Sequence, residues 1–271
     1  MLAAYLAEVN NSTLFKLQTG GFVGETIPSL SDLNRAQYDF LLTYGWEVCR
    51  KDIPFFGVRL EQFSVEYRRA AERNVRHVDL LIVLGNAGKT PSVDAHFREC
   101  VNAFSESLCR QTYPNIKYRP RALSRRLRIV PRTQALINVP KKDKDRGMLP
   151  IHELAACSRI VVQLRMPATN FLECIFVDQP VVAINTNSLS TDIIKPFESF
   201  FEECGVFHKD AKGLVNFLNQ VNIETWWKKI INDPVYAEFK RKFARSEREM
   251  NLMRSWKAEV AIRRRGNLGL S

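Results

Sequence analysis

Residue types that bind metals or carry redox chemistry are scarce in this sequence and lie far apart. The four histidines, at positions 77, 96, 152 and 208, have no metal-ligand spacing. None of the six cysteines forms a CxxC element with another. The sequence therefore indicates no metal site and no cofactor. The cysteines are expected to be buried side chains in a reducing cytoplasm, and a nucleophilic role for one of them is the open alternative.

Long apolar runs are also missing. No stretch approaches the roughly 20 apolar residues that a membrane-spanning helix needs. The first residues, Met1–Val9, have no basic start and include Glu8, which is untypical of a signal peptide. Hydrophobic residues still make up 45% of the chain, which is enough to bury a core. We therefore expect a globular protein of the cytoplasm.

Negative charge is in the minority, and the formal net charge is +11. Basic residues cluster at Arg68-Arg69, Arg119–Arg132, Lys141–Arg146, Lys240–Arg248 and Arg263–Arg265. Nucleic acid, an anionic membrane surface and a phosphorylated substrate all suit this excess, as does a solvated basic face for any one cluster. No aromatic RNP pattern, zinc spacing or KH-type loop accompanies the charge. The balance therefore favours phosphate groups and membrane headgroups.

Strand and helix patterns alternate from Asp79 onward. Apolar runs predict strands at Leu80–Leu84, Arg159–Leu164 and Pro180–Ile184, with shorter strands at Ile116–Arg119 and Leu127–Val130. Helices are predicted at Pro91–Arg110, Leu149–Ala156, Ala168–Phe176, Ile193–Cys204 and Lys212–Val221. This alternation is typical of an α/β fold, a Rossmann-like parallel sheet with flanking helices. Ligands of such sheets bind at the carboxyl ends of the strands.

Three regions divide the chain. Residues 79–233 are expected to form the Rossmann-like, donor-binding domain, and residues 234–271 a C-terminal helix and tail. The helix is predicted from Pro234 to about Ala258, because large apolar residues recur there at helical spacing. Residues 1–78 include a strand-like segment, Leu14–Leu17, but no complete βαβ unit. This first region is interpreted as the remnant of an N-terminal domain and the segment that links it to the next.

Glycine-rich turns provide two candidate phosphate contacts. Gly85–Thr90 is similar to a P-loop, but Val83 stands where the full motif requires a glycine, and Pro91 follows at once. A polar turn whose N–H groups cradle a diphosphate is the preferred interpretation, and a plain turn is the alternative. Gly20 and Gly21 let the backbone approach a phosphate or a sugar closely, or form a hinge.

Polar residues near strand ends are the other candidates. Thr169 and Asn170 begin a helix just after a strand, where they can cap the helix or bind phosphate oxygens. Glu173, one turn later, can accept hydrogen bonds from a ribose diol. Arg119 ends a strand and can pair with a phosphate in bidentate fashion. We expect Arg119 and Thr169 to lie at the same edge of the sheet.

Seven segments follow one another in a specific order between Leu154 and Val235. They are Leu154–Val162, Ala168–Glu173, Gln179–Asn185, Pro196-Phe197, Gly205–His208, Glu224–Trp227 and Asp233–Val235. Together they resemble a family of bacterial surface-carbohydrate transferases found in O-antigen loci. Upstream, Gly20–Gly24 and Tyr44–Trp46 resemble that family's segment between its two domains. The chain resembles the C-terminal part of the family.

The resemblance implies a GT-B-like protein whose C-terminal, Rossmann-like half binds a nucleotide-sugar donor without a metal of the DxD kind. It implies a lipid-linked or saccharide acceptor. The donor-site positions that it assigns are Arg119, Thr169, Asn170 and Glu173, with Gly20 and Gly21 at the cleft. The family commonly has a histidine before the paired glycines, where this chain has Gln18-Thr19, and an asparagine at the position of Pro167.

Three functions are open on the sequence. The leading hypothesis is a glycosyltransferase-like enzyme of surface-polysaccharide or O-antigen biosynthesis, which holds the donor diphosphate with N–H groups and Arg119. No residue is singled out as the general base. The second is a non-catalytic, truncated relative that acts as a binding or scaffold protein, suggested by Gln18, Pro167 and the missing part of the family's N-terminal domain. A nucleic-acid-binding protein, suggested by the charge alone, is the third.

The expected partners follow from the same resemblance. They include a separate N-terminal domain or a second copy of the chain, and a peripheral contact with the inner membrane. In that case apolar side chains near Trp256 and in residues 1–30 would be exposed, since exposed apolar patches usually mark a partner surface.

Overall fold

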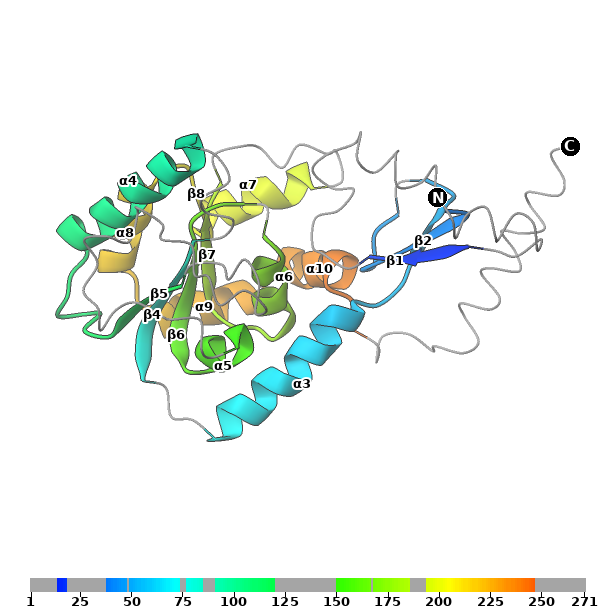
Figure 1. Cartoon of the computed structure of the whole chain (residues 1–271), viewed down its shortest axis with the longest axis horizontal. Helices are drawn as coiled ribbons and strands as arrows, with labels where there is room; N and C mark the ends of the chain where they lie inside the picture. The colour runs from blue at the N-terminus through cyan, green and yellow to red at the C-terminus, as the bar shows by residue number, and fades with distance from the viewer. Residues whose placement is uncertain are drawn as a thin grey trace, which may run out of the picture.

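The structure is a computed structural model of the 271-residue chain. It describes residues 14–18, 38–47, 49–73, 77–84, 91–119, 150–166, 168–185 and 194–246. Two parallel sheets make up the described part, a small one near the N-terminus and a large one that carries most of the helices (Figure 1).

The large sheet has five strands in the order β5-β4-β6-β7-β8. Its strands are β4 (Val78–Val83), β5 (Ile116–Arg119), β6 (Ser158–Gln163), β7 (Val181–Ile184) and β8 (Phe207–His208). The strands are all parallel to their neighbours. The helices that follow them are α4 (Pro91–Ser107), α5 (Ile151–Ala156), α6 (Thr169–Phe176), α7 (Lys195–Glu203), α8 (Ala211–Gln220), α9 (Ile223–Ile231) and α10 (Pro234–Phe243).

Helices cover both faces of the large sheet, because alternate strand residues point to opposite sides. Leu80, Ile82 and Val162 pack against α4 and α8, on what we call the α4 face. Leu81, Val83 and Val161 pack on the opposite side, the α6 face, which α5, α6, α7 and α10 cover together with α3 (Val58–Arg73). Figure 1 shows α4 and α8 on one side of the sheet and α3, α5 and α6 on the other. The continuous apolar runs of the sequence therefore correspond to strands buried on both faces.

The small sheet consists of β1 (Phe15–Leu17), β2 (Phe40–Thr43) and β3 (Asp52–Pro54), in that order and all parallel. Gln18, at the end of β1, is buried, and its Oε1 accepts hydrogen bonds from the Tyr44 N–H (2.9 Å) and Trp46 Nε1 (3.0 Å). The residue that departs from the family's histidine thus joins two parts of this sheet.

The end of α10 contacts the small sheet. The Arg245 N–H donates to the Tyr44 carbonyl (3.1 Å), and the Gly57 N–H donates to the Arg245 carbonyl (3.1 Å). Because α10 also packs on α6, α7 and α9, it connects the two sheets.

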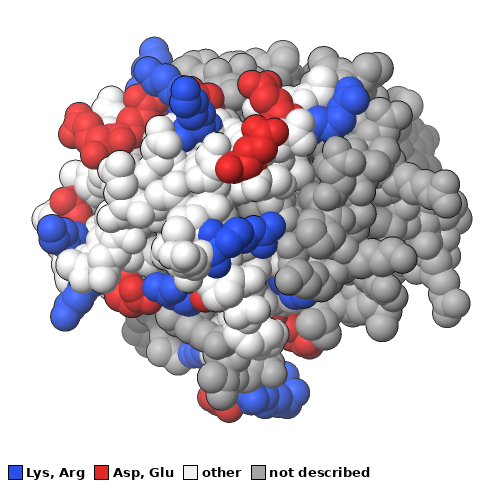
Figure 2. Space-filling view, turned by 90° about the vertical axis from the view of Figure 1, so that its left-hand side faces the viewer, with Lys and Arg blue, Asp and Glu red and all other residues white. Residues whose placement is uncertain are grey.

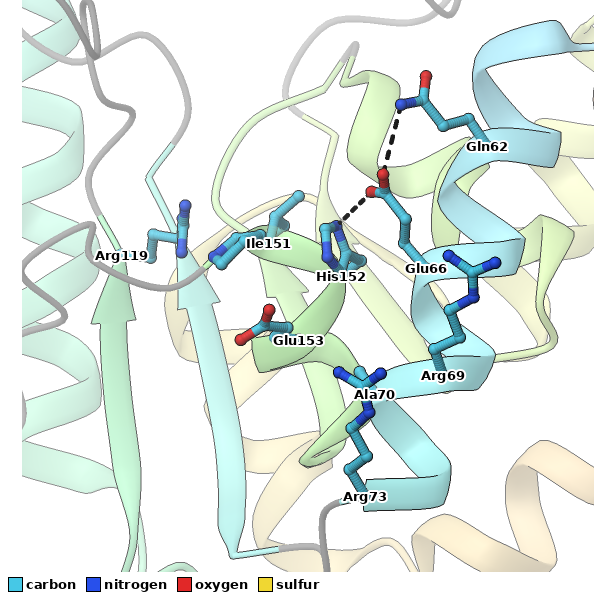
Figure 3. Close-up of a pocket in the computed structure, with 10 residues that line it drawn as sticks. Gln62, Glu66, Arg69, Ala70, Arg73, Arg119, Ile151, His152 and Glu153 are labelled. Carbon is cyan, nitrogen blue, oxygen red and sulfur yellow. Dashed lines mark hydrogen bonds and ion pairs between the residues drawn. The ribbon is translucent and has the colours of Figure 1, made fainter.

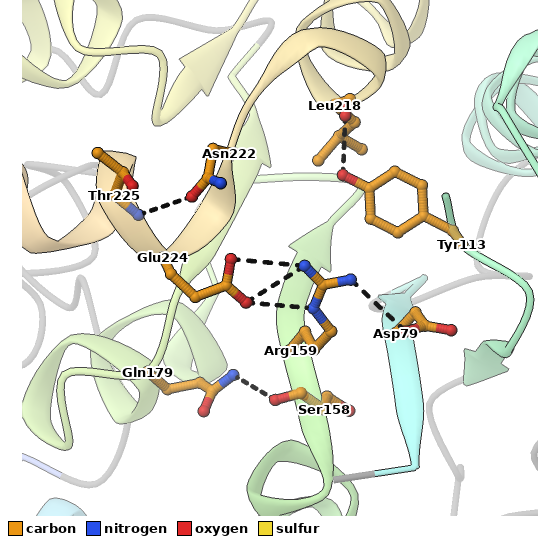
Figure 4. A network of polar contacts seen from close by, with 9 residues as sticks. All are labelled: Asp79, Tyr113, Ser158, Arg159, Gln179, Leu218, Asn222, Glu224 and Thr225. Carbon is orange, nitrogen blue, oxygen red and sulfur yellow. Dashed lines mark hydrogen bonds and ion pairs between the residues drawn. The ribbon is translucent and has the colours of Figure 1, made fainter. Parts of the chain in front are cut away.

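The amino ends of the strands are held by an ionic network (Figure 4). Arg159, near the start of β6, lies 3.2 Å from Glu224 Oε1 and 3.7 Å from Asp79 Oδ1. Beside it, the Tyr113 hydroxyl donates to the Leu218 carbonyl (2.8 Å). All of these side chains belong to the scaffold on the edge opposite to the carboxyl ends.

Most of the predicted elements are confirmed. The predicted strand Ile116–Arg119 has the predicted bounds, and the three longer strands are neighbours in one parallel sheet. The α/β, Rossmann-like class is therefore correct. Helices α3 and α9 were not predicted, and α3 packs on α5 and α6 although it precedes the expected domain boundary at residue 79. The strand expected at Leu127–Val130 lies outside the described residues. The helix predicted from Pro234 to about Ala258 ends at Phe243, where Ala244 leaves the helical conformation, so its predicted continuation through residues 244–246 is wrong, and the rest of the predicted range is not described.

Surface charge is mixed where the structure describes it. Figure 2 shows Lys and Arg side chains interspersed with Asp and Glu on one face of the molecule. The basic clusters after Arg119, up to residue 146, and at residues 263–265 lie outside the described residues. Among the described helices, none combines the length and the apolar character required to cross a bilayer.

Candidate functional site

The candidate site lies at the carboxyl edge of the large sheet, where the direction of the chain connections reverses. The chain leaves β4 through α4 towards β5 on one side, and leaves β6 through α6 towards β7 on the other. In open α/β sheets, ligands bind in the crevice outside such a reversal. The order β5-β4-β6-β7-β8 puts that crevice between the ends of β4 and β6.

Four residues stand side by side at this edge. Arg119 pairs with Val83, Val83 with Gln163, and Gln163 with Ala183. Since neighbouring strands are about 4.8 Å apart, the Cα atoms of Arg119 and Gln163 are separated by about 10 Å. Helix α4 reaches the same region, because His96 Nε2 lies 3.1 Å from the Leu164 carbonyl oxygen. Arg119 and Gln163 share the α6 face with Val83.

Helix α6 begins at this edge and presents its amino end there. Its N-cap is Ala168, which is extended, and no side chain caps the helix. Thr169 and Asn170 are therefore its first two residues, and the interpretation of these two side chains as caps is wrong. An uncapped helix N-terminus carries N–H groups and a partial positive charge that favour an anion. Thr169 and Arg119 lie at the same edge of the sheet, as expected.

Glu173 is buried one turn into α6, with a relative exposure of 2%. Its Oε1 accepts from Arg59 Nε (2.9 Å), and its Oε2 accepts from Asn170 Nδ2 (2.7 Å). Burial raises the pKa of Glu173 above its ordinary value, and the charge and hydrogen bond of Arg59 oppose that rise. Both carboxylate oxygens therefore have partners inside the protein.

A cavity of about 680 Å³ opens beside Arg119 on the α6 face, between α3 and α5 (Figure 3). Its walls include Arg69 and Arg73 of α3 and the start of α5. Glu66 lies between two of its neighbours, since its Oε2 is 2.9 Å from His152 Nδ1 and its Oε1 accepts from Gln62 Nε2 (3.3 Å). The volume suits a ligand of nucleotide size, and arginine guanidinium groups suit phosphate.

Two buried amides at the strand ends have atoms without a partner. Gln163 Nε2, at the end of β6, and Asn185 Oδ1, just after β7, make no hydrogen bond. The other atom of the Asn185 amide, Nδ2, donates to Glu198 Oε1 (3.2 Å). A buried amide without a partner costs free energy, about 1–3 kcal/mol, unless a ligand or a water satisfies it. These atoms mark the carboxyl edge as a place where a polar ligand gains hydrogen bonds.

The candidates from the sequence divide into those that the structure brings together and those outside the described residues. Thr169, Asn170 and Glu173 lie on α6, where the Asn170 and Glu173 side chains contact each other. Arg119 lines the cavity and ends β5, two strands away from β6, the strand that precedes α6. Gly20, Gly21 and the turn Gly85–Thr90 lie outside the described residues.

Sequence analysis missed Arg59 and the other α3 side chains of this region. The only signal for α3 was the helical spacing of Leu60, Phe63, Tyr67 and Ala70. Nothing in the sequence indicates that this helix lies against α5 and α6.

Other chemistry is limited in the described part of the chain. There, no group of three or more His, Cys, Asp and Glu side chains could hold a metal ion. The described cysteines are free thiols. Burial raises the pKa of Cys100 to about 12 and that of Cys204 to about 11, so both are thiols at neutral pH.

Comparisons with known proteins support a transferase. A model of the family described as LIC12162 family transferase matches residues 1–260. No curated protein matches the chain.

Among solved structures, the chain is similar to the wall teichoic acid polymerase TagF, with 11% identity, a TM-score of 0.47, and coverage of 96% of this chain and 70% of that chain. A variant of TagF aligns with 12% identity, over 94% of this chain and 67% of that chain, with a TM-score of 0.47. The same variant soaked with CDPG aligns with 12% identity, over 89% of this chain and 60% of that chain, with a TM-score of 0.43. TM-scores below 0.5 do not establish a shared fold. The assignment of the Rossmann-like class therefore depends on the parallel strands and strand order of the large sheet.

Proposed function

The chain belongs to the LIC12162 family transferases, and we propose that it transfers a sugar or a related phospho-group from a nucleotide-activated donor to a precursor of a bacterial surface polysaccharide. The observation that carries the proposal is the reversal point at the carboxyl edge of the sheet, with Arg119 and the uncapped amino end of α6 on that edge. A guanidinium and a helix N-terminus both favour an anion, which supports the binding of a diphosphate at this edge.

In this proposal the donor diphosphate lies between Arg119 and the first N–H groups of α6, near Thr169 and Asn170. An acceptor hydroxyl forms a bond to the transferred group and gives up its proton to a base. The bond from that group to the leaving nucleotide breaks at the same time: sugar transfer releases a nucleoside diphosphate and phospho-group transfer a nucleoside monophosphate. Negative charge grows on the leaving phosphate oxygen. A guanidinium and a helix N-terminus stabilise that charge more in the transition state than in the bound donor. Glu173 is proposed to receive the ribose hydroxyls, and Gly20 and Gly21, which lie outside the described residues, are assigned to the sugar.

The acceptor is proposed to be a lipid-linked or free saccharide. A lipid-linked acceptor requires a peripheral contact with an anionic membrane surface, which the net charge of +11 favours. In this proposal Arg119 and backbone N–H groups bind the donor diphosphate without a metal ion.

A thermal-shift screen with UDP, CDP, GDP, CMP and their sugar or polyol conjugates tests the proposal. A ligand at about 100 times its dissociation constant stabilises the folded state by about 2.7 kcal/mol, which raises the Tm by several degrees. We expect at least one nucleotide to produce such a shift. Indifference to every nucleotide at millimolar concentration would refute the proposed donor site.

Release of free nucleotide from the stabilising donor, with a saccharide acceptor present, then separates the enzyme from a binding protein. Turnover by the purified chain supports the transferase. Tight binding without turnover for any acceptor supports the scaffold alternative. Binding to duplex or single-stranded nucleic acid that falls steeply with salt, with no response to nucleotides, favours the nucleic-acid-binding hypothesis.

A further inference from the structure

The Glu173 carboxylate and Arg59 form an ion pair between α6 and α3. The two residues are 114 positions apart in the sequence, and Arg59 Nε lies 2.9 Å from Glu173 Oε1. The second oxygen of Glu173 is taken by Asn170. Each oxygen could accept a further hydrogen bond, but the Glu173 side chain is only 2% exposed, so a ribose diol can reach this carboxylate only if a neighbouring side chain moves aside.

Arg59 is the donor that is easier to replace. Its side chain is 54% exposed, whereas that of Glu173 is 2% exposed. Arg59 is also the second residue of α3, where a positive charge opposes the helix dipole. A half-exposed guanidinium returns to water at low cost, while the buried carboxylate has no such alternative.

We propose that Arg59 is a positioning residue for the nucleotide donor: it holds the buried Glu173 side chain as a carboxylate in the empty protein and yields one oxygen to the ribose hydroxyls when the donor binds. This inference rests on the proposed function. It assigns to α3 a part in donor binding, because the helix that follows the small sheet supplies the counter-charge for a residue of α6.

The charges around Glu173 determine its ionisation. Burial raises its pKa, while Arg59 from α3, the Asn170 amide from α6 and the His152 side chain from α5 lower it. Cys174, its neighbour in α6, is a fully buried thiol whose own pKa is raised. Loss of Arg59 removes the largest of the opposing contributions, so the pKa of Glu173 rises further. A neutral carboxylic acid is a poorer acceptor for a diol than a carboxylate.

The test compares the pH dependence of nucleotide affinity in matched variants. The probe is UDP, CDP or GDP, whichever binds the wild-type chain, titrated at about pH 6 and about pH 8.5 on either side of neutrality. For Arg59→Ala we expect the dissociation constant to rise about tenfold more than that of the wild type between the high and the low pH. Arg59→Lys keeps the charge and should follow the wild type.

Two further variants show that the effect passes through Glu173. Arg68→Ala removes a charge from the same helix, at a side chain that donates to the Ser64 carbonyl, and should leave the pH profile unchanged. In a Glu173→Gln background, Arg59→Ala should no longer alter the pH profile, because the titrating group is absent.

Thermal stability gives an independent readout of the pair. A carboxyl whose pKa is raised on folding favours the folded state at low pH and loses that contribution as the pH rises through its folded pKa. The Tm of Arg59→Ala should therefore lie further below the wild type at about pH 8 than at about pH 5. Arg59→Gln replaces Arg59→Ala if the latter does not fold.

The outcomes separate the two proposals. Nucleotide binding to the wild type with identical pH profiles in Arg59→Ala and wild type overturns the role of Arg59 and leaves the proposed function standing. Absence of nucleotide binding to the wild type at every pH overturns the proposed function, and the inference with it. A steeper profile confined to Arg59→Ala and Arg59→Gln supports both.

Discussion

At the scale of the residue, Gly45 is a position where the backbone does not tolerate a side chain. Its φ is +129°, and an added Cβ would lie 2.9 Å from the carbonyl oxygens of Arg241 and Lys242. The backbone of α10 thus approaches the small sheet closely because Gly45 has no side chain. Glycine in the family-like segment Tyr44–Trp46 therefore has a packing reason that does not involve a ligand.

Gly45→Ala should lower the free energy of unfolding by about 3 kcal/mol, since it adds backbone strain and a collision with two carbonyl groups. Urea unfolding followed by circular dichroism measures the change. Gly213→Ala is the matched control: it lies in α8, its Cβ would meet only Asp210 Oδ1 at 3.4 Å, and it should stabilise by up to about 1 kcal/mol. Equal effects of the two substitutions would contradict this account of Gly45.

Arg119 and Arg159 lie at opposite edges of the same sheet, and they should differ in what they support. Arg119→Ala should weaken nucleotide binding by about 10- to 100-fold, since a charge-assisted phosphate contact is lost, with little change in Tm. Arg159→Ala breaks the network with Glu224 and Asp79 and should lower the Tm without altering affinity. Isothermal titration calorimetry and thermal unfolding of both variants measure the two effects. Weaker binding in Arg159→Ala alone would reverse the assignment of the edges.

At the scale of the element, α10 is attached to the turn between α6 and β7. The Tyr236 hydroxyl lies 2.8 Å from Asp178 Oδ1 and 3.1 Å from the Ile175 carbonyl, and Lys240 Nζ lies 2.7 Å from Asp178 Oδ2. Asp178 has a positive φ of 55°, so the turn presents its carboxylate to the helix in a conformation that aspartate tolerates. The large apolar residues that recur at helical spacing belong to the core where they are described: Tyr236, Phe239 and Phe243 of α10 are buried.

Tyr236→Phe should destabilise the protein by about 1–2 kcal/mol, because it leaves the Ile175 carbonyl and the Asp178 carboxylate with one donor fewer. Val235→Ala, on the exposed side of the same helix, should change stability by less than about 0.5 kcal/mol. Chemical denaturation of both variants gives the comparison. A neutral effect of Tyr236→Phe would mean that water replaces the hydroxyl without cost.

At the scale of the whole molecule, the two sheets share a core. Leu41, Tyr44 and Trp46 of the small-sheet region belong to the same hydrophobic cluster as Leu81 and Val161 of the large sheet. Helix α10 bonds to both, through Arg245 on one side and Asp178 on the other. Near residue 78 the chain passes from the small sheet to the large one, and a single hydrophobic core includes residues of both sheets.

We expect a single cooperative unfolding transition from this shared core. Far-ultraviolet circular dichroism reports on all helices, and tryptophan fluorescence includes Trp46 near the small sheet and Trp226 and Trp227 of α9. The two signals should change at the same urea concentration. Two separated midpoints, with the Trp46→Phe variant lacking the earlier one, would establish that the small sheet unfolds independently.

Patterns within the sequence determined the class of the fold. Strands such as Val78–Val83 and Val181–Ile184 consist mainly of apolar and β-branched residues, and burial on both faces is a local requirement that such runs satisfy. The alternation of these runs with helical patterns leaves a parallel sheet as the solution, so the edge that carries Arg119 and Thr169 followed as well. Short or weakly patterned elements, among them β8, α3 and α9, escaped this reasoning.

The tertiary structure alone decided which side chains share the site. Arg59 and Glu173 are 114 positions apart, and no local pattern records that α3 lies against α6. The hydrogen bonds of Gln18 could not be predicted from the sequence either, because Tyr44 and Trp46 reach its amide oxygen only after β1 and β2 pair. Apolar burial acts within a few residues and is visible as periodicity, whereas an ion pair or a buried amide depends on how whole elements pack. For this protein the sequence therefore determined the sheet and the edge that carries the candidate site, and packing determined the charges around Glu173.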